Sequence, residues 1–263
     1  MPFTQVGDVR LFYTDEGEGG PPILFVHGYS CDSHDWSWQI PHFVEHHRVI
    51  AMDNRGHGRS SVPDTGYDHG DFAADTAGLI DHLGCGPVVA IGHSLGGVIV
   101  STLAIERPDL VRAVVSVDPG YLVPDAMGQA LGPVIEALQA EDPAPAAQAM
   151  LSATYSPASP MPLRTWHMRR TAGVAPHVLR QTLGNLLTGM ALESNSAPYL
   201  AQRKCPVLTM YTDPARAALE ASLMSDDRSR AVSFEGSGHW LHQERPAEFN
   251  HLVDSWLATL DAG

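Results

Sequence analysis

The sequence predicts an α/β fold, in which helices cover a mostly parallel, doubly wound sheet and a helical cap is inserted late in the chain. Short apolar segments alternate with longer segments of helical periodicity. The apolar segments lack polar alternation, which is typical of strands covered on both faces. Residues 121–200 carry helical patterns without a clear strand. We therefore divide the chain into a core, residues 1–120 and 201–263, and a cap, residues 121–200.

Seven strands are expected, and the turn-forming sequence DEGEGGPP separates the first two, which we expect to be neighbours in the sheet. In chain order the expected strands are residues 9–13, 23–26, 49–52, 88–91, 113–117, 207–211 and 231–234. Helices of the core are expected at residues 71–83, 94–107 and 247–260, where apolar residues recur at helical spacing.

Composition and charge exclude several classes of partner. The chain has 30 acidic and 16 basic residues and a formal net charge of −14, which disfavours binding to nucleic acid or to an anionic membrane. No apolar stretch approaches the roughly 18 residues of a membrane span. The amino-terminal sequence lacks the pattern of a signal peptide, and the three cysteines have no metal-binding spacing. We therefore expect a cytoplasmic protein with reduced thiols.

A serine between two glycines is the first sign of chemistry. The sequence GHSLG, residues 92–96, lies between an expected strand and an expected helix. G-x-S-x-G in this context is typical of a nucleophile elbow, a tight turn that exposes the serine at the start of a helix. The turn is too crowded for side chains on its neighbours, which explains Gly92 and Gly96. We predict Ser94 as a nucleophile.

A serine nucleophile needs a base and a site for the oxyanion. His239 lies in the loop between the last expected strand and the last helix, and this loop emerges at the same sheet edge as the elbow. The N–H of Leu95, directly after the serine, is one expected oxyanion donor. The loop after residues 23–26 turns at Gly28, so the N–H of Tyr29 is the expected second donor.

Four motifs together resemble the α/β-hydrolase superfamily, in the serine esterase and lactonase type that carries a helical cap. They are HG at 27–28, DNRGHGRS at 53–60, GHSLGG at 92–97 and GHW at 238–240. The resemblance implies that residues 53–60 form a structural turn without a catalytic role. Serine at position 94 distinguishes the chain from epoxide hydrolases and haloalkane dehalogenases, which have an aspartate there.

Two aspartates are candidates for the acid that orients the base. Asp118 ends an expected strand 24 residues after Ser94, a spacing that resembles members with the acid on this earlier strand. Asp213 follows the strand that most often supplies the acid in this family, but it comes only seven residues after Pro206 and lacks the usual preceding glycine. We predict Asp118, with Asp213 as the alternative.

The expected activity is hydrolysis of a carboxylic ester or lactone of a small apolar or aromatic substrate, through an acyl-enzyme and without metal or organic cofactor. The same scaffold also serves C–C bond hydrolases and cofactor-free haloperoxidases, and a ligand-binding receptor is the non-enzymatic alternative. Trp240, Trp166 and Tyr155 are expected to contact the substrate. The expected partner is a small molecule, and the oligomeric state is not indicated by the sequence.

Overall fold

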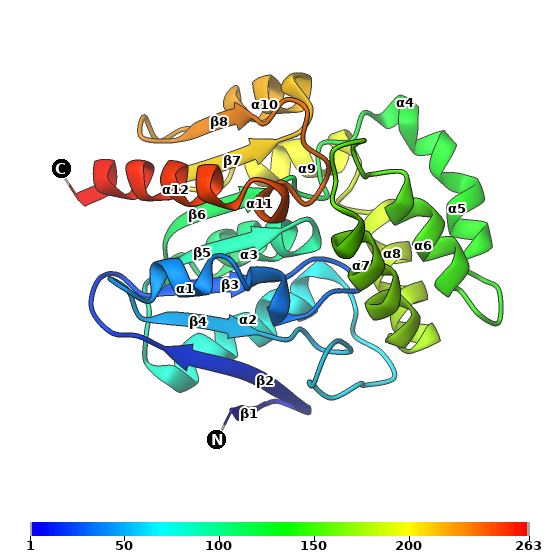
Figure 1. Cartoon of the computed structure of the whole chain (residues 1–263), viewed down its shortest axis with the longest axis horizontal. Helices are drawn as coiled ribbons and strands as arrows, with labels where there is room; N and C mark the ends of the chain where they lie inside the picture. Colours follow the sequence, from blue (N-terminus) through cyan, green and yellow to red (C-terminus); the bar gives the residue numbers. More distant parts are fainter. Residues whose placement is uncertain (1, 262–263) are drawn as a thin grey trace.

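One sheet of eight strands forms the centre of residues 2–261, the part of the chain that the computed structural model describes. Its strand order is β1-β2-β4-β3-β5-β6-β7-β8. The strands are β1 (Phe3–Val6), β2 (Val9–Glu16), β3 (Ile23–Val26), β4 (Val49–Met52), β5 (Val88–His93), β6 (Val111–Val117), β7 (Val207–Tyr211) and β8 (Arg230–Ser233). All pairs from β4 onward are parallel, so the strands from β3 to β8 end at the same edge (Figure 1).

The expected pairing of the first two predicted strands is wrong. β2 pairs with β4 in antiparallel register, and β4 lies between β2 and β3. The turn between β2 and β3 permits a tight hairpin. The buried, apolar strand β4 instead pairs with β2 along one edge and with β3 along the other. The sequence prediction also missed β1, a short edge strand that pairs with β2.

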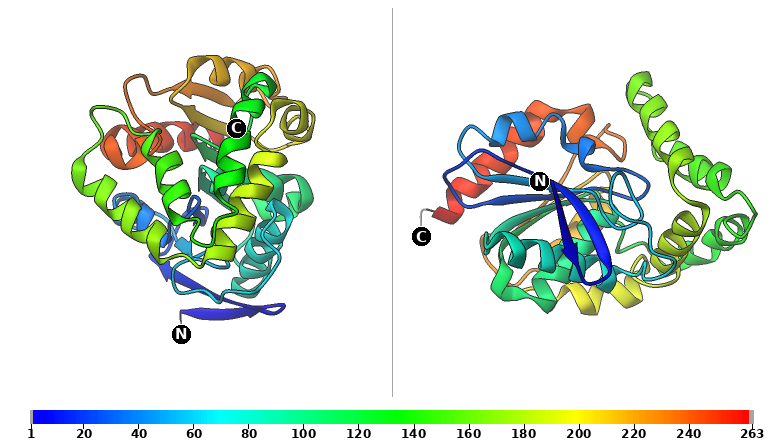
Figure 2. Two further views of the ribbon diagram at one scale, coloured as in Figure 1. Left: turned by 90° about the vertical axis from the view of Figure 1, so that its right-hand side faces the viewer. Right: turned by 90° about the horizontal axis from the view of Figure 1, so that it is seen from below.

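Helices cover both faces of the sheet. They are α1 (Ile40–Phe43), α2 (His69–Leu83), α3 (Leu95–Glu106), α10 (Pro214–Ala221), α11 (Leu241–Glu244) and α12 (Pro246–Asp261). In β3, Ile23 and Phe25 belong to the apolar cluster with α1 and α12, whereas Leu24 and Val26 belong to the cluster with α2 and α3. Figure 2 shows the sheet between these two layers. The all-apolar strands of the sequence are thus explained by burial on both faces.

Residues between β6 and β7 form the helical layer over the carboxyl edge of the sheet (Figure 1). Its helices are α4 (Asp125–Gly128), α5 (Gly132–Ala137), α6 (Ala144–Ser152), α7 (Met161–Gly173) and α8 (Pro176–Thr188), and α9 (Glu193–Leu200) follows them. The two ends of this layer meet where Val123 N donates to Ala191 O at 2.9 Å and Val123 O accepts from Glu193 N at 2.9 Å. After these two hydrogen bonds, α9 lies against the core, since its Leu200 packs in one apolar cluster with Val98 and Tyr211.

Among the described residues, no helix has both the length and the apolar character that crossing a membrane requires.

Candidate active site

Ser94 occupies a strained turn between β5 and α3. Its φ and ψ are 54° and −114°, outside the regions that L-residues normally adopt. A Cβ at Gly92 would lie 2.1 Å from Gly96 O, and a Cβ at Gly96 would lie 2.1 Å from Val26 O. The two glycines of the motif are therefore required by backbone packing, which explains the elbow sequence.

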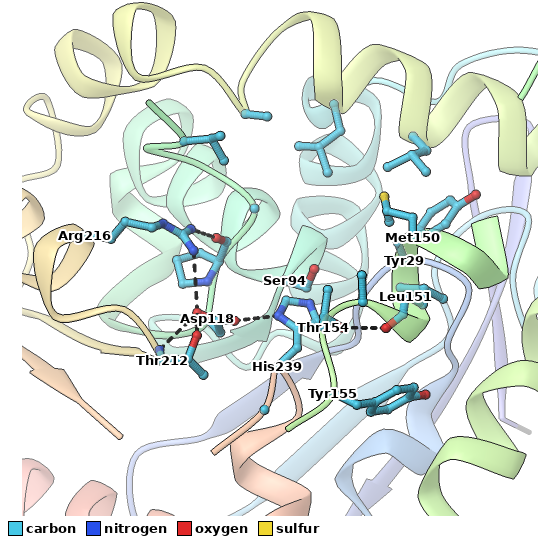
Figure 3. A pocket seen from close by; sticks show the side chains of 18 of the residues that line it. Tyr29, Ser94, Asp118, Met150, Leu151, Thr154, Tyr155, Thr212, Arg216 and His239 are labelled. Carbon is cyan, nitrogen blue, oxygen red and sulfur yellow. Dashed lines mark hydrogen bonds and ion pairs between the residues drawn. The ribbon is translucent and has the colours of Figure 1, made fainter. Parts of the chain in front are cut away.

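The structure brings Asp118 and His239 together at the carboxyl edge of the sheet. Asp118 follows β6, His239 follows β8, and His239 Nδ1 lies 2.6 Å from Asp118 Oδ2. Figure 3 shows the His239 ring between Asp118 and Ser94. The Ser94 hydroxyl has no hydrogen-bond partner within the described residues, and hydrogen bonds to a catalytic base often tighten only when substrate binds.

Asp213, the alternative acid, has a different role. Its side chain is exposed and accepts a hydrogen bond from Ala215 N at 2.9 Å, so it caps the amino terminus of α10. Asp-Pro at the start of a helix is favourable for this reason. The geometry thus places Asp118, and not Asp213, against His239.

Asp118 is held as a buried anion. Burial alone would raise the pKa of its carboxyl group, but the hydrogen bond from His239 and the positive charges of His239 and Arg216 outweigh burial, and the pKa is lowered. Its Oδ1 also accepts from Thr212 N and Thr212 Oγ1, both at 3.3 Å. Arg216 Nη1 lies 3.6 Å from the same oxygen. Asp118 therefore stays ionised at neutral pH and keeps the proton of His239 on Nδ1.

The expected oxyanion donors lie next to Ser94. A Cβ at Gly28 would lie 3.2 Å from Ser94 Cβ, so glycine lets the loop after β3 approach the elbow. Among the described residues, neither the Tyr29 N–H nor the Leu95 N–H has a hydrogen-bond acceptor. The Tyr29 phenol donates to Leu179 O in α8 at 3.0 Å, so its hydroxyl anchors the cap.

A cavity of about 460 Å³ joins these groups. One end is polar and contains Ser94, Asp118 and His239 together with Thr212 and Arg216. The opposite wall comes from the cap and is apolar (Figure 3). It is lined by Val123, Met150, Leu151, Leu183, Leu186, Leu187 and Ala191.

Of the three aromatic residues expected to contact substrate, the structure places one in this cavity. Tyr155 lines it. Trp240 does not: it is 1% exposed and is stacked on His167 and Tyr155, with ring centres 4.0 Å and 4.9 Å apart. Trp166 does not either, since it lies on the outer side of α7, is 53% exposed and borders a different hollow with Arg170.

Sequence reasoning missed two parts of the site. The α8 leucines 183, 186 and 187 recur at helical spacing, so a helical pattern in the cap was the available signal. Arg216 lies three residues after Asp213 in the helix that Asp213 caps. It donates to Tyr121 O at 2.7 Å and to Pro119 O. Nothing in the local sequence indicates that this helix turns Arg216 toward Asp118.

Comparisons with known proteins place the chain among hydrolases. A profile of the Alpha/beta hydrolase family matches residues 23–252. The 2-(acetamidomethylene)succinate hydrolase of Mesorhizobium japonicum is 30% identical over 251 residues, covering 92% of this chain and 89% of that protein. The non-heme haloperoxidase of Rhodococcus erythropolis is 46% identical over 99 residues, covering 37% of this chain and 36% of that protein. A solved structure of an N-acyl homoserine lactone degrading enzyme matches with a TM-score of 0.81 and 26% identity, covering 97% of this chain and 99% of that one.

Proposed function

Because the chain belongs to the alpha/beta hydrolase family, we propose that it is a serine hydrolase that cleaves a carboxylic ester or lactone of a small apolar or aromatic substrate. The observation that carries the proposal is the 2.6 Å contact between His239 Nδ1 and Asp118 Oδ2, in the cavity that also contains Ser94. A buried carboxylate on one ring nitrogen leaves the other nitrogen unprotonated, as a general base requires.

In the proposed mechanism, Ser94 Oγ attacks the carbonyl carbon while His239 Nε2 takes its proton. The carbonyl oxygen becomes an oxyanion that accepts hydrogen bonds from the N–H groups of Tyr29 and Leu95. The tetrahedral intermediate collapses, the ester C–O bond breaks, and His239 returns the proton to the leaving alcohol. In typical sites of this kind, one oxyanion donor contributes roughly 10²–10³ in kcat.

The second half of the mechanism uses the same groups. His239 deprotonates a water molecule, which attacks the acyl-enzyme formed on Ser94. A second tetrahedral intermediate collapses to the carboxylic acid and the free serine hydroxyl. With a lactone, the alcohol and the acid are released as one molecule. Asp118 stays ionised throughout and stabilises the imidazolium that forms twice in each cycle.

The cavity supports an uncharged, apolar substrate. Leucines and a methionine of the cap form the wall that faces Ser94, so an aliphatic or aromatic acyl group finds a dry surface there. Arg216 is the only arginine or lysine among the described residues that line the cavity. Its guanidinium already donates to two main-chain carbonyls and faces Asp118. We therefore propose that substrates with several carboxylates, such as a succinate derivative, are poor substrates for this chain.

Two other activities on this triad, C–C bond hydrolysis and haloperoxidation, are alternatives within the same proposal. The similarity to the haloperoxidase concerns about a third of each protein. Both reactions also need Ser94 and His239, so they differ from ester hydrolysis in the group that leaves or in the second nucleophile. A receptor without turnover is the remaining alternative.

A labelling experiment and a substrate panel test the proposal. We expect a fluorophosphonate probe to label the wild type and to leave Ser94→Ala unlabelled. We also expect turnover of p-nitrophenyl acetate, butyrate and hexanoate, with much slower turnover of p-nitrophenyl succinate. Labelling of Ser94→Ala would overturn the assignment of the nucleophile. Tight ligand binding without turnover of any ester or lactone would favour the receptor.

A further inference from the structure

A group of buried polar side chains lies directly behind the base loop. Asp35, His93 and His242 are 0%, 1% and 0% exposed. One ligand atom from each of the three residues lies within 4.8 Å of the others. Asp35 Oδ2, His93 Nδ1 and His242 Nδ1 have no hydrogen-bond partner among the described residues. Since unsatisfied buried polar atoms are costly, three of them in one buried group require an explanation. The mechanism above uses none of these residues.

The proton on His93 is assigned by its other nitrogen. His93 Nε2 lies 3.0 Å from the main-chain oxygen of His239, which can only accept, so Nε2 carries the proton and donates. Burial lowers the pKa of His93, which favours the neutral ring. Nδ1 is therefore an acceptor, and it faces Asp35 Oδ2 at 3.8 Å.

Asp35 contributes a second acceptor. Arg170, from helix α7 of the cap, lies 2.8 Å from Asp35 Oδ1, and the Gln243 amide nitrogen donates to the same oxygen at 3.0 Å. Burial alone would raise the pKa of the Asp35 carboxyl group, but the charge of Arg170 and the neighbouring histidines hold it well below its usual range. Asp35 is thus an anion whose Oδ2 faces His93 Nδ1.

His242 completes the buried group. The Gln243 amide oxygen lies 3.2 Å from His167 Nε2, and its nitrogen donates to Asp35 O at 3.2 Å. The same nitrogen lies 3.5 Å from His242 Nε2. The ring centres of His242 and His93 are 4.6 Å apart, so the two rings are neighbours.

The surroundings of this group disfavour a metal ion. A divalent cation here would lie beside the ion pair of Asp35 with Arg170, whose positive charge opposes a cation. The group is held instead by contacts to its other atoms. Asp35 Oδ1 pairs with Arg170 and Gln243, and His93 Nε2 donates to the main-chain oxygen of His239.

We propose that this cluster positions the general base, with His93 as the residue that makes the contact; the inference rests on the proposed function. His93 directly precedes Ser94 in the chain, and its side chain donates a hydrogen bond to the main-chain oxygen of His239. One residue therefore ties the nucleophile to the loop that carries the base. On the other side, His239 N donates to Thr154 O of the cap at 3.0 Å. With both main-chain groups of His239 held, its ring keeps one distance from Ser94.

The matched pair His93→Gln and His93→Asn tests the proposal. The Gln amide nitrogen occupies nearly the place of Nε2 and reaches the His239 carbonyl, whereas the Asn amide is one methylene too short. We expect His93→Asn to lose about 10- to 100-fold in kcat on p-nitrophenyl butyrate with KM within about twofold, since a displaced base slows chemistry and leaves binding intact. We expect His93→Gln to retain kcat within about threefold of wild type.

A spectroscopic signature separates positioning from general damage. The proton between His239 and Asp118 is expected as a downfield NMR signal that persists in wild type and His93→Gln and broadens or shifts in His93→Asn. Thr209→Val is the control for loss of a buried polar group away from this cluster, and it should leave kcat and the signal unchanged. If His93→Asn does not fold, His93→Phe takes its place in the comparison with Gln.

Several outcomes would overturn the positioning role. One is an unchanged kcat in His93→Asn, and another is an equal loss in both folded variants. Stoichiometric zinc or iron in the purified protein, measured by mass spectrometry, would show that a metal ion and not these side-chain contacts organises the group. Ser94→Ala is assayed in parallel to separate the two proposals. If Ser94→Ala keeps wild-type turnover, the proposed function itself fails. If Ser94→Ala loses turnover while both His93 variants keep it, only the positioning role is refuted.

Discussion

Replacing Asp118 by asparagine is expected to reverse the proton arrangement of His239. Thr212 N–H and Oγ1 donate to Asp118 Oδ1, and the Arg216 guanidinium lies nearby, so this position requires an oxygen. An asparagine must therefore place its amide oxygen there and its NH₂ group against His239 Nδ1, where Oδ2 now lies at 2.6 Å. His239 Nδ1 then has to accept, and the proton moves to Nε2, which faces Ser94.

The magnitude follows from this exchange. A base that carries a proton toward the nucleophile cannot accept another, and the imidazolium also loses its buried counter-charge. Serine hydrolases with this change lose about 10⁴ in kcat, and we expect a loss of about 10³ to 10⁴ here, equivalent to about 4 to 5.5 kcal/mol. KM should change little, because Asp118 is 5% exposed and lies behind the base.

The assay is steady-state hydrolysis of p-nitrophenyl butyrate by Asp118→Asn, with Asp213→Asn as the matched control. Asp213 caps α10, and asparagine is an equally good cap, so the control should keep kcat within about twofold and lose little stability. Both variants should show the circular dichroism spectrum of the wild type. Collapse of kcat in Asp213→Asn together with normal turnover by Asp118→Asn would refute the assignment of the acid.

Two further predictions concern stability and substrate size. Burial lowers the pKa of His57 to about 3 and that of His167 to about 4, whereas a histidine in the unfolded chain has a pKa near 6.5. Between these values the unfolded chain binds more protons than the folded chain, so the free energy of unfolding should fall by about 2 kcal/mol per histidine from pH 7 to pH 5. A free energy of unfolding that stays constant in urea titrations over this pH range would contradict the prediction. Leu183→Phe should narrow the apolar wall and lower kcat/KM for p-nitrophenyl hexanoate about tenfold relative to acetate; an unchanged ratio would show that acyl groups bind elsewhere.

Helices and strands were predictable wherever burial of one face produces a periodic pattern of apolar residues in the sequence. The predicted helix at 71–83 corresponds to α2, His69–Leu83, which begins at the capping box of Asp68 and Asp71 and ends at Gly84 in the left-handed conformation. By contrast, β1 and the position of β4 between β2 and β3 depend on which strands meet, and an apolar segment does not specify its partner. The pairing was decided by the packing of the whole sheet.

The same distinction applies to the pocket. By sequence position Trp240, directly after His239, is the strongest candidate of the three aromatic residues, yet of Tyr155, Trp166 and Trp240 only Tyr155 lines the cavity. The direction of each side chain depends on how the cap helices sit on the core, which residues far apart in the chain determine together. Arg216 and the leucines of α8 reach the cavity for the same reason.

The sequence by itself determined the elbow. A Cβ at Gly92 would meet Gly96 O, a contact within the motif itself, so this part of the constraint is local. A Cβ at Gly96 would meet Val26 O, at the end of the neighbouring strand β3. Only the tertiary structure distinguishes Asp118 from Asp213: Asp118 contacts His239, whereas Asp213 caps α10. Both follow neighbouring parallel strands at the same edge of the sheet, so local sequence does not separate them. The contact of Asp118 with His239 joins residues more than 100 positions apart in the sequence. It therefore depends on where the loop after β8, which carries His239, lies in the folded chain.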